Sequence, residues 1–345
     1  MFETLGLGIT PQAASVWFGL MIGLAFGVLA QLTGFCLRRA LVGSRAERGA
    51  ARGVWAMALG VAVIGTQGAV ALGLVSFEAH RFAAGSVPVA SIILGGLMFG
   101  FGTVLARGCL SRLTVLSASG NLRALVAIIV AALAAQAILQ GALAPLRLAL
   151  SAVVVPLDGL PGAGWLWAVV IAGLALLIVI RSQASGAMLL GGALIGALVP
   201  LAWIGTGFVL FDEFDPIALQ GLAFTGPWAD ALFWGIAAQV TTAGFGVGLV
   251  GGVLLGALAA ALGSRQFQIE AFSGAGQMGR SLGGAVLMGL GGVLAGGCTV
   301  GAGLAGLPTL GISAIMAFGA VVAGIYAGDA VLARRGANRG MLAAQ

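Results

Sequence analysis

The three cysteines of this chain are the residues best suited to chemistry, and each one ends a related stretch of sequence. The segment 95–109, GGLMFGFGTVLARGC, returns at 284–298 as GAVLMGLGGVLAGGC, with eight of fifteen positions identical. Cys109 and Cys298 close these two strong copies. A weaker copy ends at Cys36, where Val-Leu-Ala is followed after a short gap by Gly-Phe-Cys. The coincidence indicates one repeated structural device rather than three unrelated core positions.

A thiol is a weak hydrogen-bond donor and a weak acceptor, and its sulfur is soft and polarizable. A neutral thiol could donate its S–H to the sulfur end of an anion and release it again, because loose binding at several sites favours passage. No base adjoins any of the cysteines in the sequence, which favours the neutral form. The candidate substrate-binding residues are the cysteines, a glycine close before each, and one nearby arginine. They are Cys36, Cys109, Cys298, Gly34, Gly108, Gly297 and Arg107.

Other interpretations of these residues stay open. The cysteines could be inert core side chains in a channel for neutral solutes. They could instead form persulfides or disulfides in a membrane thiol enzyme, either a sulfurtransferase or a redox relay. Arg107 could be a snorkelling anchor at the membrane surface. The sequence has no Cys-x-x-Cys, P-loop or Ser-His-Asp pattern and one histidine, His80, so we expect no enzyme activity, no cofactor and no metal site.

Composition places these residues in a membrane protein. Hydrophobic residues make up 60% of the chain and charged residues 8%, whereas a soluble domain carries about 25% charged residues. The net charge of +6 comes from arginines near the ends of apolar segments, so it does not indicate nucleic-acid binding. We expect an all-α polytopic membrane protein with one integral membrane transport domain over residues 1–345. Nine apolar segments lie at 14–36, 53–76, 91–106, 122–144, 165–181, 186–205, 230–262, 281–297 and 311–332, most of them near the roughly 20 residues of a span. The segment 230–262 is too long for one straight span, and we expect a break near residues 241–244.

The arginines predict one topology, because short cytoplasmic loops are rich in basic residues. If the N-terminus is periplasmic and the segments alternate, fourteen of sixteen arginines fall on the cytoplasmic side, and so does the C-terminus. Only Arg81 and Arg147 fall outside. The two strong copies then run in opposite directions, so the elements 91–144 and 281–332 are expected to form an inverted-topology repeat. Each copy should hold a broken or half-spanning helix with its cysteine at the break.

The repeated G-x-G-x-V-L-A-x-G-C block, the Gly-Phe-Cys at Cys36 with its following arginines, and the nine glycine-rich segments resemble the YeeE/YedE family over nearly the whole chain. The resemblance implies an importer of the bacterial inner membrane for thiosulfate or a related sulfur anion; some relatives are associated with selenium metabolism. It implies that Cys36, Cys109 and Cys298 pass the anion along by S–H hydrogen bonds. Besides the lipid bilayer, the implied partner is a separate cytoplasmic TusA-like sulfur-carrier protein.

Overall fold

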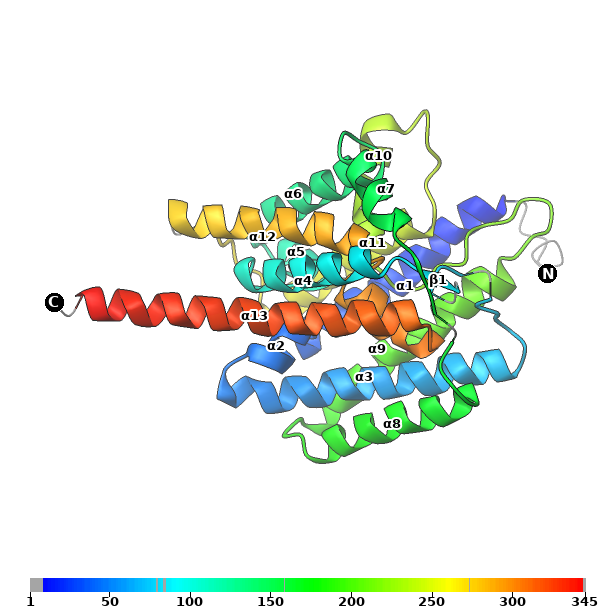
Figure 1. The fold of residues 1–345 in the computed structure, drawn as a ribbon, viewed down its shortest axis with the longest axis horizontal. Coiled ribbons are helices and arrows are strands. Elements are labelled where there is room, and N and C mark those ends of the chain that lie inside the picture. The colour runs from blue at the N-terminus through cyan, green and yellow to red at the C-terminus, as the bar shows by residue number, and fades with distance from the viewer. Residues whose placement is uncertain (1–8, 79, 83–84, 158, 273, 344–345) are drawn as a thin grey trace.

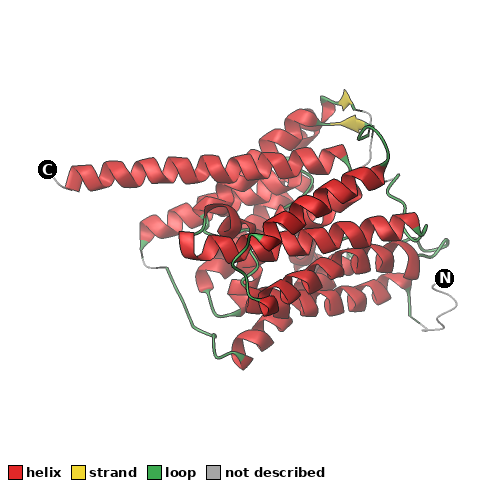
Figure 2. Ribbon diagram, turned by 90° about the horizontal axis from the view of Figure 1, so that it is seen from below, coloured by secondary structure: helices red, strands yellow, loops and turns green. Residues whose placement is uncertain are grey.

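The computed structural model describes residues 9–343, apart from 79, 83–84, 158 and 273. Figure 2 shows that nearly all of the regular structure is helical, with two short strands at one end. The longer helices are α1 (Pro11–Thr33), α3 (Arg45–Ala71), α4 (Val89–Leu105), α6 (Leu122–Leu139), α8 (Gly164–Ile180), α9 (Gly186–Ile204), α10 (Thr225–Ala237), α11 (Phe245–Gly263), α12 (Ala275–Leu294) and α13 (Ile312–Ala343). The shorter elements are α2 (Leu37–Val42), α5 (Leu110–Ala118), α7 (Ala144–Ala152), the π-helices η2 (Gly205–Val209) and η3 (Thr299–Gly306), the 3-10 turn η4 (Leu307–Thr309), and the antiparallel strands β1 (Ser86–Val87) and β2 (Val155–Pro156).

Eight helical stretches of the described chain are long and apolar enough to cross a membrane, and they match eight of the nine expected segments. The ninth, α8, is apolar but has only 17 residues, or about 25 Å of helix, and it lies along α3 (Figure 1). The expected segment 230–262 is divided, because α10 ends at Ala237 and only α11 is long enough for a span. The predicted all-α polytopic class is confirmed.

The helices run between two ends of the molecule. Helix α1 begins at one of them, called here the α1 end, and α13 finishes at the other, called the α13 end (Figure 1). Helix α3 reaches the α1 end, whereas α12 begins at the α13 end. The N-terminus itself lies outside the described residues. The arginine pattern predicts an odd number of crossings, and this arrangement of α1 and α13 corresponds to an odd number when α8 is counted with the eight longer stretches.

Three of the membrane-spanning stretches are interrupted, and a cysteine stands at each interruption. Cys36 separates α1 from α2, Cys109 separates α4 from α5, and Cys298 separates α12 from η3. Backbone at membrane depth leaves the helical form only where protein or a cavity surrounds it, and all three cysteines are buried. The helix breaks predicted at the cysteines are therefore present.

Helices α4 and α12 pack antiparallel through matching glycines. A Cβ added to Gly95 would lie 2.7 Å from the carbonyl oxygen of Gly291, and one added to Gly102 would lie 2.5 Å from that of Gly284. In the sequence repeat Gly95 corresponds to Gly284, and Gly102 to Gly291. Each glycine thus meets the counterpart of the other, as a two-fold axis between inverted copies requires. Glycine lets the two backbones approach this closely.

The neighbours of these two helices follow the same relation. Helix α4 packs on α13, and α12 packs on α6. The equivalent glycines make these contacts: a Cβ on Gly100 would meet the carbonyl oxygen of Val321 in α13, and one on Gly289 would meet that of Ala131 in α6. The order of break, short helix and long helix therefore occurs twice, once in each direction. This arrangement places Cys109 and Cys298 on either side of the contact between α4 and α12.

Candidate functional site

All three cysteines occupy the same backbone turn. Two residues before each of them the chain is left-handed, with φ of 62° at Gly34, 61° at Arg107 and 74° at Gly296. A left-handed residue is a common way to end a helix. Each cysteine is then extended and forms the N-cap of the next helix, which is α2, α5 or η3. Since Arg107 and Gly296 are equivalent in the sequence repeat, the repeated sequence encodes a repeated conformation.

The turn gives each thiol the same orientation. Each sulfur faces the backbone N–H three residues further on, at Arg39, Arg112 and Gly301 respectively. At Cys298 this is a hydrogen bond, with 3.3 Å between the Gly301 nitrogen and the sulfur. The first N–H groups of a helix have no partner within the helix. Each thiol therefore lies beside backbone donors that favour partial negative charge on a sulfur atom.

The thiols are far apart in the sequence but close in the core. Their residues are free and buried, with exposed fractions of 4% for Cys36, 1% for Cys109 and 1% for Cys298. The thiol of Cys36 approaches that of Cys109. The Cys109 sulfur lies 3.2 Å from the Ser111 hydroxyl oxygen, and the hydroxyl of Thr299, the neighbour of Cys298, also approaches it. Cys109 therefore stands between the other two cysteines.

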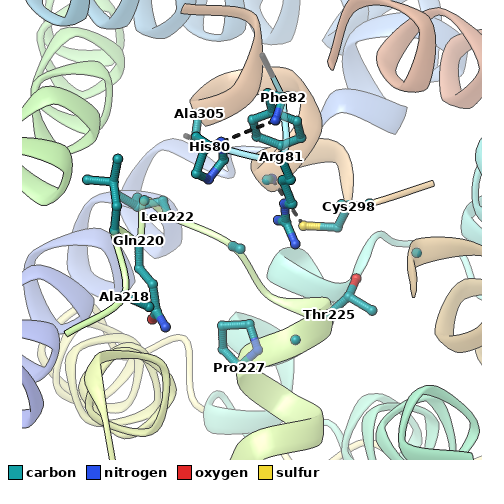
Figure 3. A pocket seen from close by; sticks show the side chains of 18 of the residues that line it. His80, Arg81, Phe82, Ala218, Gln220, Leu222, Thr225, Pro227, Cys298 and Ala305 are labelled. Atoms are coloured by element: carbon teal, nitrogen blue, oxygen red, sulfur yellow. Dashed lines mark hydrogen bonds between the residues drawn. The ribbon is translucent and has the colours of Figure 1, made fainter. Parts of the chain in front are cut away.

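A cavity of about 590 Å³ reaches Cys298 from the α1 end. Its walls are the segment between α3 and β1, the segment between η2 and α10, and the break after α12. Gly296 and Gly297 line it next to Cys298, whereas Cys36 and Cys109 do not line it. In Figure 3 the side chain of Arg81 extends from the opposite wall toward Cys298. We call this cavity the Cys298 pocket.

Three residues that line the Cys298 pocket carry polar side-chain groups without protein partners. Arg81 has no carboxylate partner among the residues that the structure describes, and its guanidinium lies 5.1 Å from the centre of the Phe82 ring. Within the same described set, Trp203 Nε1 and Thr225 Oγ1 are buried and have no hydrogen-bond partner. Both residues line the pocket. Because an unpaired buried donor is costly, this lining favours a ligand with several acceptor atoms.

Besides Cys298, the titratable groups that line the pocket are His80, Arg81 and Asp230. Burial, together with the nearby charge of Arg81, lowers the pKa of His80 to about 4, so the imidazole is neutral near pH 7. Burial also raises the pKa of Asp230 and lowers that of Arg81. Arginine begins from so high a pKa that it stays charged. In the part of the chain that the structure describes, no three side chains of the metal-binding types gather into a group.

The predicted glycines lie at the breaks, and Arg107 lies apart from the Cys298 pocket. A Cβ on Gly297 would lie 2.8 Å from the backbone nitrogen of Ala302, so this position tolerates no side chain without a shift. Gly108 is less confined, since its Cβ would lie 3.3 Å from the side chain of Leu113. Arg107 lines a second, smaller cavity that shares no lining residue with the Cys298 pocket. The seven predicted residues therefore do not line one pocket: Gly297 and Cys298 line the Cys298 pocket, and Arg107 lines the second cavity.

Sequence reasoning did not include Arg81, Trp203 or Thr225 in the site. The available signal for Arg81 was its place as one of two arginines on the side that is poor in arginine. Trp203 and Thr225 belong to no motif. Trp203 lies near the end of α9 and Thr225 begins α10, so they reach the pocket only through the tertiary packing of these helices.

Comparison with known proteins agrees with this geometry. The sequence model of a family described as "Sulphur transport" matches residues 35–327, which include all three cysteine breaks. The thiosulfate transporter TsuA of Escherichia coli strain K12 is 36% identical over 111 residues, a region that spans 31% of this chain and 28% of TsuA. The family resemblance predicted from the cysteine motifs is confirmed. Because the family model matches most of the length of this chain, the chain belongs to the sulphur transport family.

Proposed function

We propose that this protein imports thiosulfate or a closely related sulfur anion across the bacterial inner membrane. Membership of the sulphur transport family and the partial similarity to a thiosulfate transporter support the substrate class. The observation that carries the proposal is the buried series of three thiols that begins at a pocket with an unpaired arginine. Such a series offers an anion successive weak donors without a strong trap.

The proposed route starts at the α1 end. Arg81 attracts the anion into the Cys298 pocket, where Trp203 and Thr225 donate to its oxygens. The thiol of Cys298 donates its S–H to the terminal sulfur of the anion. The thiol of Cys109 and then the thiol of Cys36 make the same hydrogen bond as the anion moves on. No covalent bond forms at any step, so the route requires neither an oxidant nor a reductant. Each of the seven predicted residues has a role in this route. The thiols belong to Cys36, Cys109 and Cys298, and the turns that hold them contain Gly34, Gly108 and Gly297. Arg107 supplies a positive charge on the far side of the thiols from the Cys298 pocket.

The orientation and the partner belong to the same proposal. The α13 end carries most of the arginines and is cytoplasmic, and the N-terminus is periplasmic, following the positive-inside rule. The whole chain forms one integral membrane transport domain. A TusA-like sulfur-carrier protein is the partner that receives the imported anion at the α13 end.

Replacing any one of the cysteines tests the thiol route. We expect Cys36→Ser, Cys109→Ser and Cys298→Ser each to lower uptake of labelled thiosulfate into vesicles by about tenfold or more, because a hydroxyl lacks the soft, weak S–H donor. Ser15→Ala is the control, since this residue is buried in α1 and bonds only to Gln12. Size-exclusion profiles like that of the wild type establish folding. Wild-type uptake by all three variants would refute the thiol route.

The approach of Cys36 to Cys109 also favours a second candidate, a membrane thiol enzyme that forms a persulfide or a disulfide. Intact-protein mass spectrometry after exposure to thiosulfate separates the two. An unchanged mass during active uptake supports the non-covalent route. A retained sulfur atom or the loss of two hydrogens supports the enzyme. Uptake that survives replacement of all three cysteines identifies a channel in which they take no part.

A further inference from the structure

Four arginines surround the second cavity, which lies at the α13 end and has a volume of about 260 Å³. They come from different elements: Arg38 from α2, Arg107 from the break before Cys109, Arg123 from the start of α6, and Arg280 from α12. The cavity lies on the side of the molecule opposite the Cys298 pocket. We call it the arginine cavity.

The arginines of this cavity lack carboxylate partners. Within the described chain, none of the four forms an ion pair. Nε of Arg38 and Oγ of Ser281, which also lines the cavity, are buried without a hydrogen-bond partner there. Arg280 donates from Nε to the carbonyl oxygen of Gly276 at 3.3 Å, which leaves its other nitrogens available. The cavity is therefore a concentration of unpaired donors.

The charges of the cavity repel one another. Arg123 experiences the positive charges of both Arg107 and Arg38, and Glu270 opposes them only in part. The Glu270 carboxylate is already bonded to the side-chain amide of Asn121 at 2.5 Å. Guanidinium groups held near one another without a counter-charge are stabilised by a bound anion.

Arg107 occupies a backbone conformation that favours glycine. Its φ is 61°, and its counterpart in the second copy is Gly296 with φ of 74°. Glycine takes this conformation without steric cost, whereas a side chain does not. The first copy thus keeps an arginine where the second copy has glycine, and that arginine faces the cavity.

The inverted repeat relates the arginine cavity to the Cys298 pocket. Val104 and Arg107 line the arginine cavity, and their counterparts Val293 and Gly296 line the Cys298 pocket. The two-fold relation therefore turns one cavity into the other. In the Cys298 pocket the positive charge comes from Arg81 on a separate segment, whereas in the arginine cavity Arg107 of the repeated block contributes part of it.

We propose that the arginine cavity is a binding site for a tetrahedral, doubly charged oxyanion of the sulfate or thiosulfate type. Guanidinium groups bind such oxygens by charge-assisted hydrogen bonds. A role for this site as the last binding site of the transported anion rests on the proposed function. The binding of an anion in the cavity does not depend on that function. A phosphate headgroup of an anionic lipid has the same chemistry and is the other source of such a ligand.

Binding of labelled sulfate to the full chain in nanodiscs of zwitterionic lipid at low salt tests the site. The Arg81→Gln background removes the competing charge of the Cys298 pocket. We expect Arg107→Gly and Arg123→Gln each to weaken sulfate binding by about tenfold. Arg107→Gly restores the residue that the second copy has at this turn, so it is compatible with the fold.

Arg265→Gly is the matched control. Arg265 is an exposed arginine with φ of 55°, and it lies outside the cavity, so its replacement removes one charge and relieves the same conformation. We expect unchanged sulfate affinity in this variant. Equal affinities for Arg107→Gly and Arg265→Gly would overturn the site. Nanodiscs with added anionic lipid identify the occupant: weaker sulfate binding there assigns the site to a headgroup, and unchanged binding assigns it to a soluble anion.

The triple variant Cys36→Ser, Cys109→Ser, Cys298→Ser separates this site from the thiol route. We expect it to lose uptake and to keep the Arg107-dependent sulfate binding. Wild-type vesicles that do not take up thiosulfate would refute the proposed function and leave the binding result intact. Sulfate affinity that is indifferent to Arg107 would refute the site and leave the thiol route intact.

Discussion

Among the described residues that line the Cys298 pocket, Arg81 is the charged residue whose side chain extends toward Cys298 (Figure 3). Its neighbour His80 adds no charge near pH 7, because its pKa is lowered to about 4. Asp230, the carboxylic acid in the lining, has a raised pKa and is not paired with Arg81 in the described structure. A cation without an ion-pair partner in a partly enclosed pocket attracts anions to its own side of the pocket. In the proposed route, Arg81 attracts the anion and the thiols pass it on.

We expect Arg81→Gln to raise the thiosulfate concentration that gives half-maximal uptake by about tenfold. The maximal rate should change less, because the thiols are untouched. Saturation curves in vesicles measure both quantities. Arg147→Gln is the control, since Arg147 is the other arginine on the predicted periplasmic side and does not line the pocket. An unchanged curve for Arg81→Gln would show that the pocket does not recruit the anion by charge.

At the scale of elements, each break places a cysteine between two helices, because one helix ends and the next begins within a single turn. The left-handed residue ends the first helix, and the extended cysteine starts the second. The glycines of α4 and α12 hold these two antiparallel helices together, with one break at each end of their contact. The close backbone approach between these helices leaves no room for side chains at the contact.

This packing predicts opposite effects at two adjacent glycines of α12. A Cβ on Gly284 would lie 2.7 Å from the Gly102 carbonyl oxygen, whereas one on Gly283 meets nothing within 4 Å. Gly284→Ala should destabilise the protein by about 1–3 kcal/mol through overpacking. Gly283→Ala should be neutral or stabilising by about 0.5–1 kcal/mol, because alanine favours the helix. Thermal unfolding in detergent compares them, and equal midpoints would contradict the packing.

At the scale of the whole molecule, the two cavities lie at opposite ends and the thiols lie between them. Helix α11 runs parallel to α1, because Gly19, Gly23 and Gly27 meet positions that advance along α11 in the same order. The loop after α11 is therefore at the α13 end, together with the arginine cavity. Import requires the Cys298 pocket to face the periplasm and the arginine cavity to face the cytoplasm.

Labelling of single cysteines tests this orientation in a background with all three native cysteines replaced by serine. Glu213 and Ser264 are exposed residues, between η2 and α10 and between α11 and α12 respectively. We expect a membrane-impermeant maleimide to label Glu213→Cys in intact spheroplasts and Ser264→Cys only after lysis. The reverse pattern would place the arginine cavity outside and contradict import by this route.

The sequence by itself determined the membrane class, the helix breaks at the three cysteines and the inverted direction of the two strong copies. These properties depend on composition, on short apolar runs and on glycines within a few residues of each cysteine, all of which act locally. The length of the segment 230–262 also predicted a break near residues 241–244, and the structure divides this segment there between α10 and α11. The tertiary structure decided that Cys36 meets Cys109, that Arg81 faces Cys298, and that Arg107 belongs to a separate cavity. These contacts join segments far apart in the chain, so they depend on how whole helices pack, which no local spacing specifies.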